Sequence, residues 1–412
     1  MANPIAIATV RTSIVFGLRL LIQAATLLLV ARSLGPKQFG IFASITALAL
    51  LLGTLSTFGT HLMLLGAASK DPDQRNHVLP YAIPLTLICG GLLLIVFLLI
   101  CMMVLNGDNV SWYVLLMIGG AELLLQPLLA FPVTELLASE RTARSQLLQI
   151  LPMALRVFAA GSVFVWQPSD PLTAYSYGYA LATLFSLILA LFYMPQPWPS
   201  LKDWRMPTLV EMRESASFAA LHITAIGPAE LDKVLASKLL SSTAAGLYAA
   251  AARMVGAVTF PVIALMLSAM PRLFREGASQ PERTMCLMRW IFAATLIYSL
   301  TLAVILWSCA SWFIPLLGSK YHGVDEVVRW LCIAVPGIAL RIAAGAALMA
   351  LGQPWMRAGF EIMGVFALVL AAATLTSFFG QSGMPLATAC SEWVMAIIGI
   401  SLVIRLQRIN NK

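Results

Sequence analysis

Charged residues are scarce in this sequence. Asp, Glu, Lys and Arg make up 11% of its 412 residues, whereas hydrophobic residues make up 60%. A soluble domain is about 25% charged, and the polar stretches here are too short to form a soluble domain of about 50 residues or more. The composition therefore predicts an all-α membrane protein that crosses the bilayer many times.

Motifs for metal binding and catalysis are also missing. The chain has six cysteines and four histidines. The cysteines fall in apolar runs, with no CxxC pair and no histidine cluster nearby, which indicates small buried side chains rather than metal ligands. No connecting segment is long enough, or carries the His and Asp pair, that a membrane-bound ligase or acyltransferase requires. We therefore expect no enzyme activity, no metal site and no cofactor.

What the sequence does contain is about twelve apolar runs separated by polar turns, each run suited to a helix that crosses a bilayer. Their approximate limits are 12–33, 39–65, 80–105, 112–138, 147–167, 172–194, 215–239, 246–270, 285–312, 325–350, 358–379 and 385–405. Residues Gly227 and Pro228 interrupt the seventh run, where they are expected to break or kink the helix.

The basic residues are divided unequally between the two sets of turns. About sixteen Lys and Arg lie in one set and about five in the other. Because basic residues collect on the cytoplasmic side, both termini are expected in the cytoplasm. The same bias explains most of the net charge of +8, so no nucleic-acid partner is expected.

The longest connection, residues 195–213, is expected to be a cytoplasmic linker between two lobes, 1–194 and 214–412. Its prolines forbid one continuous helix, and its tryptophans and basic residues suit a membrane interface. An internal repeat supports this division, because the segment 40–43 (GIFA) matches 246–249 (GLYA). Since each lobe has an even number of spans, we expect two six-helix lobes related by a parallel pseudo-two-fold axis along the membrane normal.

Five cations lie deep inside predicted spans. They are Arg19, Arg156, Lys233, Arg253 and Arg341. Together they cost roughly 12–18 kcal/mol on the insertion scale before any pairing. Such a cost requires water, carboxylates on neighbouring helices or an anionic ligand.

Four acids also lie deep inside predicted spans. They are Glu122, Glu230, Asp232 and Glu392. Either these acids neutralise the deep cations, or they are protonatable groups that couple transport to an ion. Arginine cannot be deprotonated, so any proton coupling must use the acids. Glu230 is three residues before Lys233, which predicts a pair on one helix face.

The turn between the first two predicted spans carries the motif AR-x-LGP-x-x-FG-x-F. Its residues are Ala31, Arg32, Leu34, Gly35, Pro36, Phe39, Gly40 and Phe42. A counterpart, GLY-AAA-R at 246–253, follows the seventh span, with Asp232 and Lys233 before it. This arrangement resembles the polysaccharide-transporter (Wzx-type) branch of the multidrug/oligosaccharidyl-lipid/polysaccharide (MOP) flippase superfamily.

That resemblance implies two six-helix lobes around a central cationic cavity. It also implies ion-coupled, alternating-access translocation of an undecaprenyl-diphosphate-linked oligosaccharide, an O-antigen or exopolysaccharide repeat unit, across the bacterial inner membrane. The implied partners are this lipid-linked substrate, membrane lipid, a polysaccharide polymerase and a chain-length regulator, and the protein is expected to be a monomer. Arginine suits the diphosphate because its guanidinium can bind phosphate oxygens in a bidentate way.

We therefore expect Arg19, Arg156, Arg253, Arg341 and Lys233 to contact the substrate. Replacing Arg19 or Arg341 with alanine is expected to preserve folding and stop polysaccharide export. An ion-coupled multidrug or cation exporter of the same superfamily is the main alternative, although it should have an acid-dominated cavity. A non-transporting scaffold of a polysaccharide machine is a further alternative, but it would not need buried cations.

Overall fold

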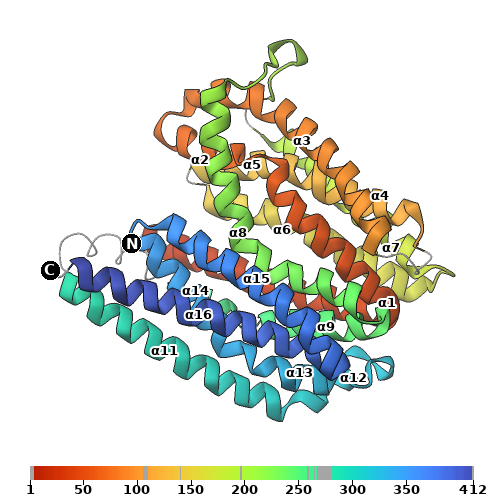
Figure 1. The fold of residues 1–412 in the computed structure, drawn as a ribbon. Helices are drawn as coiled ribbons and strands as arrows, with labels where there is room; N and C mark the ends of the chain where they lie inside the picture. The colour runs from red at the N-terminus through yellow and green to blue at the C-terminus, as the bar shows by residue number, and fades with distance from the viewer. Residues whose placement is uncertain are drawn as a thin grey trace. The chain divides into compact units, whose positions relative to one another are not determined.

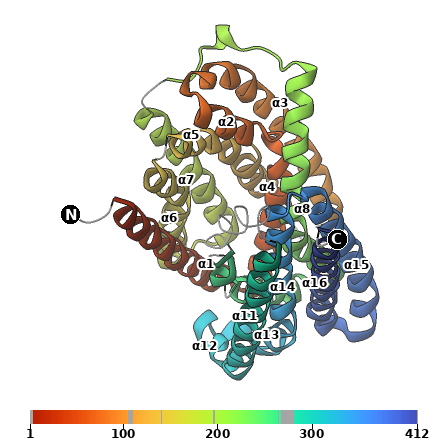
Figure 2. The same ribbon diagram turned by 90° about the vertical axis from the view of Figure 1, so that its left-hand side faces the viewer.

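The computed structural model is helical throughout the part of the chain that it describes (Figures 1 and 2). It describes residues 4–104, 110–139, 141–194, 197–257, 259–263, 265–266 and 281–410. The chain divides into two compact units, Met1–Ile223 and Thr224–Lys412. We describe each unit separately.

The first unit is built from the N-terminal helices. They are α1 (Pro4–Ser56), α2 (Thr60–Lys70), α3 (Arg75–Val104), α4 (Trp112–Gly120), a π-helical turn (Ala121–Leu125), α5 (Gln126–Ala138), α6 (Thr142–Trp166), α7 (Pro171–Tyr193) and the start of α8 (Leu209–Leu239). Helix α1 packs against α6, and α6 packs against α7. A core cluster that includes Leu79, Phe131 and Leu187 joins α3, α5 and α7.

The second unit contains the rest of α8 and the C-terminal helices. They are α9 (Ser242–Ala257), α11 (Pro281–Ser308), α12 (Phe313–Leu317), α13 (Val324–Cys332), α14 (Ala334–Ala350), α15 (Pro354–Phe379) and α16 (Gly383–Asn410). Helices α15 and α16 run side by side, and α14 packs against α16 (Figures 1 and 2). Their core includes Phe360, Met395 and Leu348.

Each predicted span overlaps one or more helices within the residues that the structure describes. Within the described residues, eight helical segments are long and apolar enough to cross a membrane, or nine if the bent pair α13 and α14 is one span. Two of these segments, Gly17–Ser56 and Pro354–Leu406, each overlap two predicted spans. Helix α8 is not among them, since it carries several charged residues. The prediction of an all-helical, multi-pass membrane protein is confirmed.

The polar turn expected after the first span is reduced to a kink. Helix α1 bends at Gly35, whose φ of 69° and ψ of 170° are not helical. A positive φ of this size favours glycine, because a side chain would clash there, and Pro36 cannot donate a hydrogen bond to the preceding turn. The motif residues Phe39 and Phe42 then lie buried in the first unit.

The expected linker lies within the first unit, because its side chains pack there rather than between two units. Trp198 and Trp204 pack against the α3–α5–α7 core cluster, and Arg75 donates a hydrogen bond to the carbonyl of Pro197 at 3.2 Å. The boundary between the units instead falls between residues 223 and 224, inside α8. The helix continues through Gly227 and Pro228, so the expected break is not present in α8.

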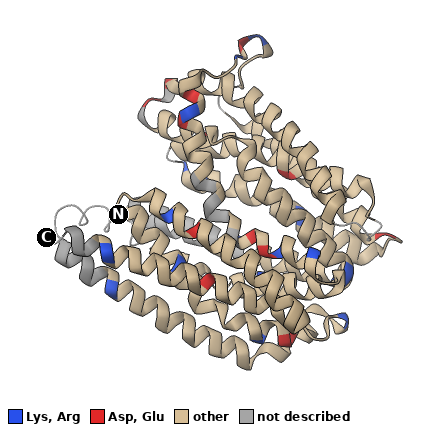
Figure 3. Ribbon diagram, viewed as in Figure 1, with Lys and Arg blue, Asp and Glu red and all other residues tan. Residues whose placement is uncertain are grey.

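Large apolar side chains are exposed along the outer helices. Phe158, Phe192 and Phe378 are 74%, 83% and 81% exposed. In water such a surface would mark an interaction site, but in a membrane protein it is the surface that contacts lipid. Charged residues, by contrast, are sparse along the described helices, and some of opposite sign lie next to one another (Figure 3).

Candidate functional site

The first unit contains a buried polar cluster around Glu122 and Arg156. The carboxylate of Glu122 is 2.9 Å from Nη2 of Arg156 and also accepts a hydrogen bond from the Tyr179 hydroxyl. The same Nη2 donates to Oγ1 of Thr183 at 2.7 Å. The central carbon of the guanidinium lies over the Tyr179 ring, 3.5 Å from its centroid. Four polar side chains from three segments thus pair with one another in the apolar interior, although Nε of Arg156 has no acceptor among the described residues.

The backbone around Glu122 is unusual, because Ala121–Leu125 forms a π-helical turn between α4 and α5. Such turns insert an extra residue and re-aim side chains, often at functional sites. Two glycines let neighbouring helices approach this turn. A Cβ added at Gly53 of α1 would lie 2.9 Å from the carbonyl oxygen of Glu122, and one at Gly90 of α3 would lie 2.4 Å from that of Leu123.

Replacing Gly90 with alanine is therefore expected to displace the π-helical turn and to destabilise the protein by about 1–3 kcal/mol, the usual cost of overpacking. Thermal unfolding of the purified protein in detergent measures this effect. Gly91 is the matched control, because a Cβ there meets nothing within 4 Å. The Gly91→Ala variant should unfold at the wild-type temperature or slightly above it; equal loss in both variants would contradict the steric argument.

Arg19 lies on α1 beside α6 and has a different kind of partner. Its Nη1 donates to the side-chain oxygen of Gln149 at 3.4 Å, and its Nε is buried without an acceptor among the described residues. An amide does not neutralise a guanidinium as a carboxylate does. Arg19 therefore keeps its full positive charge inside the predicted first span.

The second unit contains a cluster at Asp232 and Lys233 of α8. Nζ of Lys233 is 3.1 Å from Asp232 and 3.5 Å from Glu230, which confirms the pair predicted from the spacing of Glu230 and Lys233. The Tyr248 hydroxyl lies 2.7 Å from Asp232 and 2.7 Å from Thr388. Through these two hydrogen bonds, Tyr248 of α9 connects α8 to α16.

A second buried pair joins α14 and α16. Nε of Arg341 is 2.6 Å from the carboxylate of Glu392, and both side chains are less than a tenth exposed. Gly337 lies one turn before Arg341, and a Cβ there would be 3.1 Å from the backbone of Glu392. The glycine lets α16 approach α14, and the approach places Glu392 opposite Arg341.

Three of the five predicted substrate cations thus have carboxylate partners. Arg156 is paired with Glu122, Lys233 with Asp232 and Glu230, and Arg341 with Glu392. Arg253 is partly buried on α9 and lies within electrostatic range of Lys233. These pairs explain how the helices accommodate their charges, and each pair is also a place where protonation or a competing anion would release a cation.

No group of three or more His, Cys, Asp or Glu residues that could hold a metal ion occurs among the residues that the structure describes.

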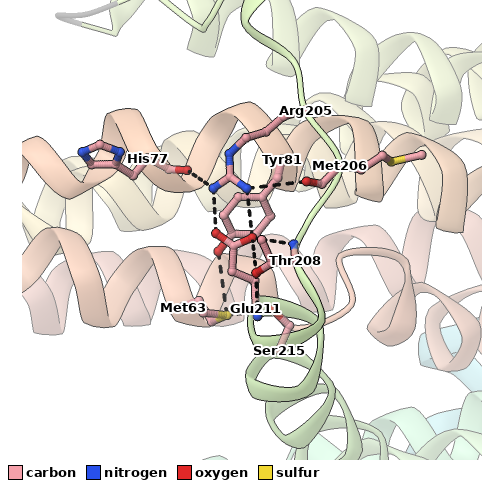
Figure 4. Close-up of polar contacts among 8 residues, drawn as sticks. All are labelled: Met63, His77, Tyr81, Arg205, Met206, Thr208, Glu211 and Ser215. Atoms are coloured by element: carbon pink, nitrogen blue, oxygen red, sulfur yellow. Dashed lines mark hydrogen bonds and ion pairs between the residues drawn. The ribbon is translucent and has the colours of Figure 1, made fainter.

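A further polar cluster fixes the connection between α7 and α8 (Figure 4). Arg205 binds both carboxylate oxygens of Glu211, at 2.9 and 2.6 Å, and donates to the carbonyl of His77 at 3.2 Å. Its guanidinium lies 4.7 Å from the centroid of the Tyr81 ring. The connection is therefore attached to α3, and the start of α8 is held with it.

Low pH should release the connection between α7 and α8 from α3. The hydrogen bonds from Arg205, with those from Thr208, lower the pKa of Glu211 to about 2. A lowered pKa means that the contact stabilises the fold above the ordinary pKa of 4.5 and that this contribution is lost as pH falls through about 2. A spin label at position 202, in a Lys202→Cys variant without native cysteines, should become mobile as pH falls from 5 toward 2. With Glu211→Gln added, the label should be mobile already at pH 7; an immobile label there would contradict the prediction.

Comparison with known families supplies the identification. The family described as "Polysaccharide biosynthesis protein" matches residues 9–276, more than half of the chain. The chain belongs to this family. Comparison with curated protein sequences gives no significant match.

Solved structures share the fold of this family member at low sequence identity. A multidrug resistance MATE family transporter of the MOP superfamily, in an inward-facing conformation, has a TM-score of 0.77 at 15% identity, covering 97% of this chain and 98% of that one. The lipid II flippase MurJ has a TM-score of 0.72 at 12% identity, covering 95% and 87%. A MOP superfamily transporter from Pyrococcus furiosus, described as having a binding pocket of reverse polarity, has a TM-score of 0.66 at 12% identity, covering 98% and 95%.

These matches confirm the resemblance inferred from the sequence motif. The chain is a polysaccharide biosynthesis family member, and its fold is that of solved MOP superfamily transporters.

The sequence analysis missed the hydroxyl groups that complete the buried clusters of this family member. Tyr179 and Thr183 hold Glu122 and Arg156, Tyr248 donates to Asp232, and Thr388 is hydrogen-bonded to the Tyr248 hydroxyl. The hydroxyl groups of the first unit could have been found from their spacing, because Tyr175, Tyr179 and Thr183 follow one another at intervals of four residues and share one face of a helix. Tyr248 belongs to the repeated segment 246–249, and its counterpart Phe42 packs edge-on against Tyr179 at 5.9 Å.

Proposed function

We propose that this protein translocates an undecaprenyl-diphosphate-linked oligosaccharide, an O-antigen or exopolysaccharide repeat unit, across the bacterial inner membrane by ion-coupled alternating access. The family match supports a role in polysaccharide biosynthesis. The shared fold supports transport, and one protein with this fold, MurJ, is a flippase for lipid II.

The observation that carries the proposal is the environment of Arg19. A guanidinium within an apolar helix costs about 2.5–3.5 kcal/mol at the bilayer centre, and among the described residues this one is offset by an amide, not a carboxylate. A permanent cation without a carboxylate partner suits an anionic substrate. A diphosphate can also accept hydrogen bonds from the guanidinium in a bidentate way.

The other predicted residues take two roles in this proposal. Arg156, Arg253, Arg341 and Lys233 contact the diphosphate or an anionic glycan when they are separated from their carboxylates. Glu122, Glu230, Asp232 and Glu392 are the groups that gain or lose a proton during coupling. Each acid except Glu230 is less than a tenth exposed.

The arrangement in the cell is part of the same proposal. Both termini lie in the cytoplasm, the protein acts as a monomer in membrane lipid, and its partners are a polysaccharide polymerase and a chain-length regulator. The bias of basic residues toward one set of turns supports the orientation.

Deletion of the protein from its host tests the proposal. The undecaprenyl-diphosphate-linked oligosaccharide should accumulate on the inner leaflet, where mass spectrometry of extracted lipids identifies it, and the surface polysaccharide should be lost. Wild-type protein and an Arg329→Ala variant, which loses an exposed pair with Asp325 and an exposed hydrogen bond to Ser311, should both restore export. Normal surface polysaccharide in the deletion strain would contradict the proposal.

A multidrug or cation exporter is the second candidate, and one observation favours it. The carboxylates of Glu122, Asp232 and Glu392 neutralise Arg156, Lys233 and Arg341, so the deep charges are more balanced than the sequence suggested. Increased sensitivity of the deletion strain to cationic dyes, with polysaccharide unchanged, would favour this second function.

A further inference from the structure

The guanidinium of Arg156 uses only part of its hydrogen-bonding capacity. Its Nη2 donates to Glu122 at 2.9 Å and to Thr183 at 2.7 Å. Its Nε is buried and has no acceptor among the described residues. The adjacent Nε and Nη2 groups form the edge that binds a carboxylate or phosphate in a bidentate way, so Glu122 leaves half of that edge unused.

Glu122 also holds Arg156 with an oxygen that is already shared. Oε1 accepts both from Arg156 and from the Tyr179 hydroxyl. The Tyr179 ring lies beneath the guanidinium, 3.5 Å from its central carbon. The ring and Thr183 would keep the guanidinium in place if Glu122 moved away, because neither contact involves the carboxylate.

A second guanidinium with an unused buried donor, that of Arg19 on α1, lies beside the same helix, α6. Gln149, the partner of Arg19, precedes Arg156 by seven residues, so the two share one face of α6. Nε of Arg19 is also buried without an acceptor among the described residues. In the second unit, by contrast, Nε of Arg341 binds Glu392 at 2.6 Å. The described Nε atoms that are buried without an acceptor on these three arginines are therefore both in the first unit.

We infer that this face of α6 is the diphosphate subsite and that Glu122 is a built-in competitor, which occupies Arg156 until a phosphate group displaces it. The inference rests on the proposed function and locates its anion contact in the first unit. A phosphate offers enough oxygens to accept from Nε and Nη2 together, which a single shared carboxylate oxygen does not. Displacement leaves Glu122 without its cation in an apolar interior, so the carboxylate takes up a proton.

If displacement of Glu122 is accompanied by proton uptake, the affinity for diphosphate changes with pH, and this change can be measured. The groups that face Glu122 and Arg156 are Tyr175, Tyr179 and Thr183, and no second carboxylate is among these contacts. If one proton enters with each bound diphosphate, the affinity rises by up to about tenfold for each unit that pH falls.

The test is binding of farnesyl diphosphate to the full-length protein in nanodiscs at pH 6, 7 and 8, measured by calorimetry. Wild-type protein should bind more tightly at pH 6 than at pH 8. Glu122→Gln should bind at least about tenfold more tightly at pH 8 and lose the pH dependence, because a glutamine cannot hold the cation as a carboxylate does. Arg156→Ala should lose most of the binding.

Glu135→Gln is the matched control, because Glu135 is also a buried carboxylate of the first unit, 2.6 Å from an arginine, Arg75. It should bind farnesyl diphosphate with the wild-type affinity and pH dependence. If Glu122→Gln fails to fold, Tyr179→Phe provides the second variant: it keeps the ring under Arg156, removes a hydroxyl that holds Glu122, and should also tighten binding.

The outcomes separate this inference from the proposed function. If the wild type binds farnesyl diphosphate but Glu122→Gln binds it no more tightly, the competitor role is overturned and the proposed function stands. If Glu122→Gln does not fold, the same result in Tyr179→Phe has the same meaning. Absence of farnesyl diphosphate binding to the wild type would contradict both. Inorganic diphosphate provides the second arm: weaker binding than farnesyl diphosphate supports a lipid-linked ligand, whereas equal binding supports the subsite but contradicts a lipid-linked substrate.

Discussion

Replacing Arg341 with alanine should lower the free energy of unfolding by about 3–5 kcal/mol, the usual cost of removing one partner of a buried ion pair. Glu392 is 5% exposed and would lose its contact with Arg341 at 2.6 Å. The sequence analysis expected this variant to fold normally, but the geometry predicts a lower unfolding temperature, measured for the purified protein in detergent.

A double variant separates stability from transport at the same site. Arg341→Met combined with Glu392→Leu removes both charges and fills similar volumes, so it should regain most of the lost stability. If Arg341 also contacts the substrate, the double variant should remain defective in polysaccharide export. Wild-type unfolding of Arg341→Ala alone would contradict a structural role for the pair.

Replacing Arg19 with alanine should leave folding intact and reduce polysaccharide export by at least about tenfold, since a hydrogen bond to a charged group is worth about 1.5–3 kcal/mol. The described partner of Arg19 is the amide of Gln149 at 3.4 Å, so its removal leaves no buried carboxylate without a cation. Surface polysaccharide in the complemented deletion strain measures export, and thermal unfolding measures stability.

Two further variants show which property of Arg19 matters. Arg19→Lys keeps the charge but not the planar guanidinium, so its export should lie between those of the alanine variant and the wild type. Gln149→Leu removes the amide and keeps Arg19, and it should retain most of the export if the amide only positions the side chain. Wild-type export by Arg19→Ala would remove this residue from the mechanism.

Sequence reasoning located the helices because their signal is local. A run of about 20 apolar residues can cross a bilayer only as a helix that satisfies its own backbone, and every predicted span overlaps a helix in the described part of the chain. The family was also readable from a dozen residues around Gly35, and the family match now shows it. The depth of Arg19, Arg156 and Arg341 in apolar runs was evident for the same local reason.

The partners of those charges could not be read in this way. Arg156 and Glu122 are 34 residues apart, and Arg341 and Glu392 are 51 residues apart. Their pairing depends on which helices pack together and in what register. The close approaches at Gly53, Gly90 and Gly337 help to set that register. The sequence alone does not indicate which helix packs against each glycine.

By itself, therefore, the sequence determined which stretches form apolar helices, the family, and which charges lie deep in apolar surroundings, because each depends on residues close together in the chain. Only the tertiary structure decided that Arg156 and Arg341 are neutralised while Arg19 meets an amide. It also decided that the connection after α7 is attached to the first unit. Both depend on contacts between distant segments, whose side chains meet only when the helices have packed.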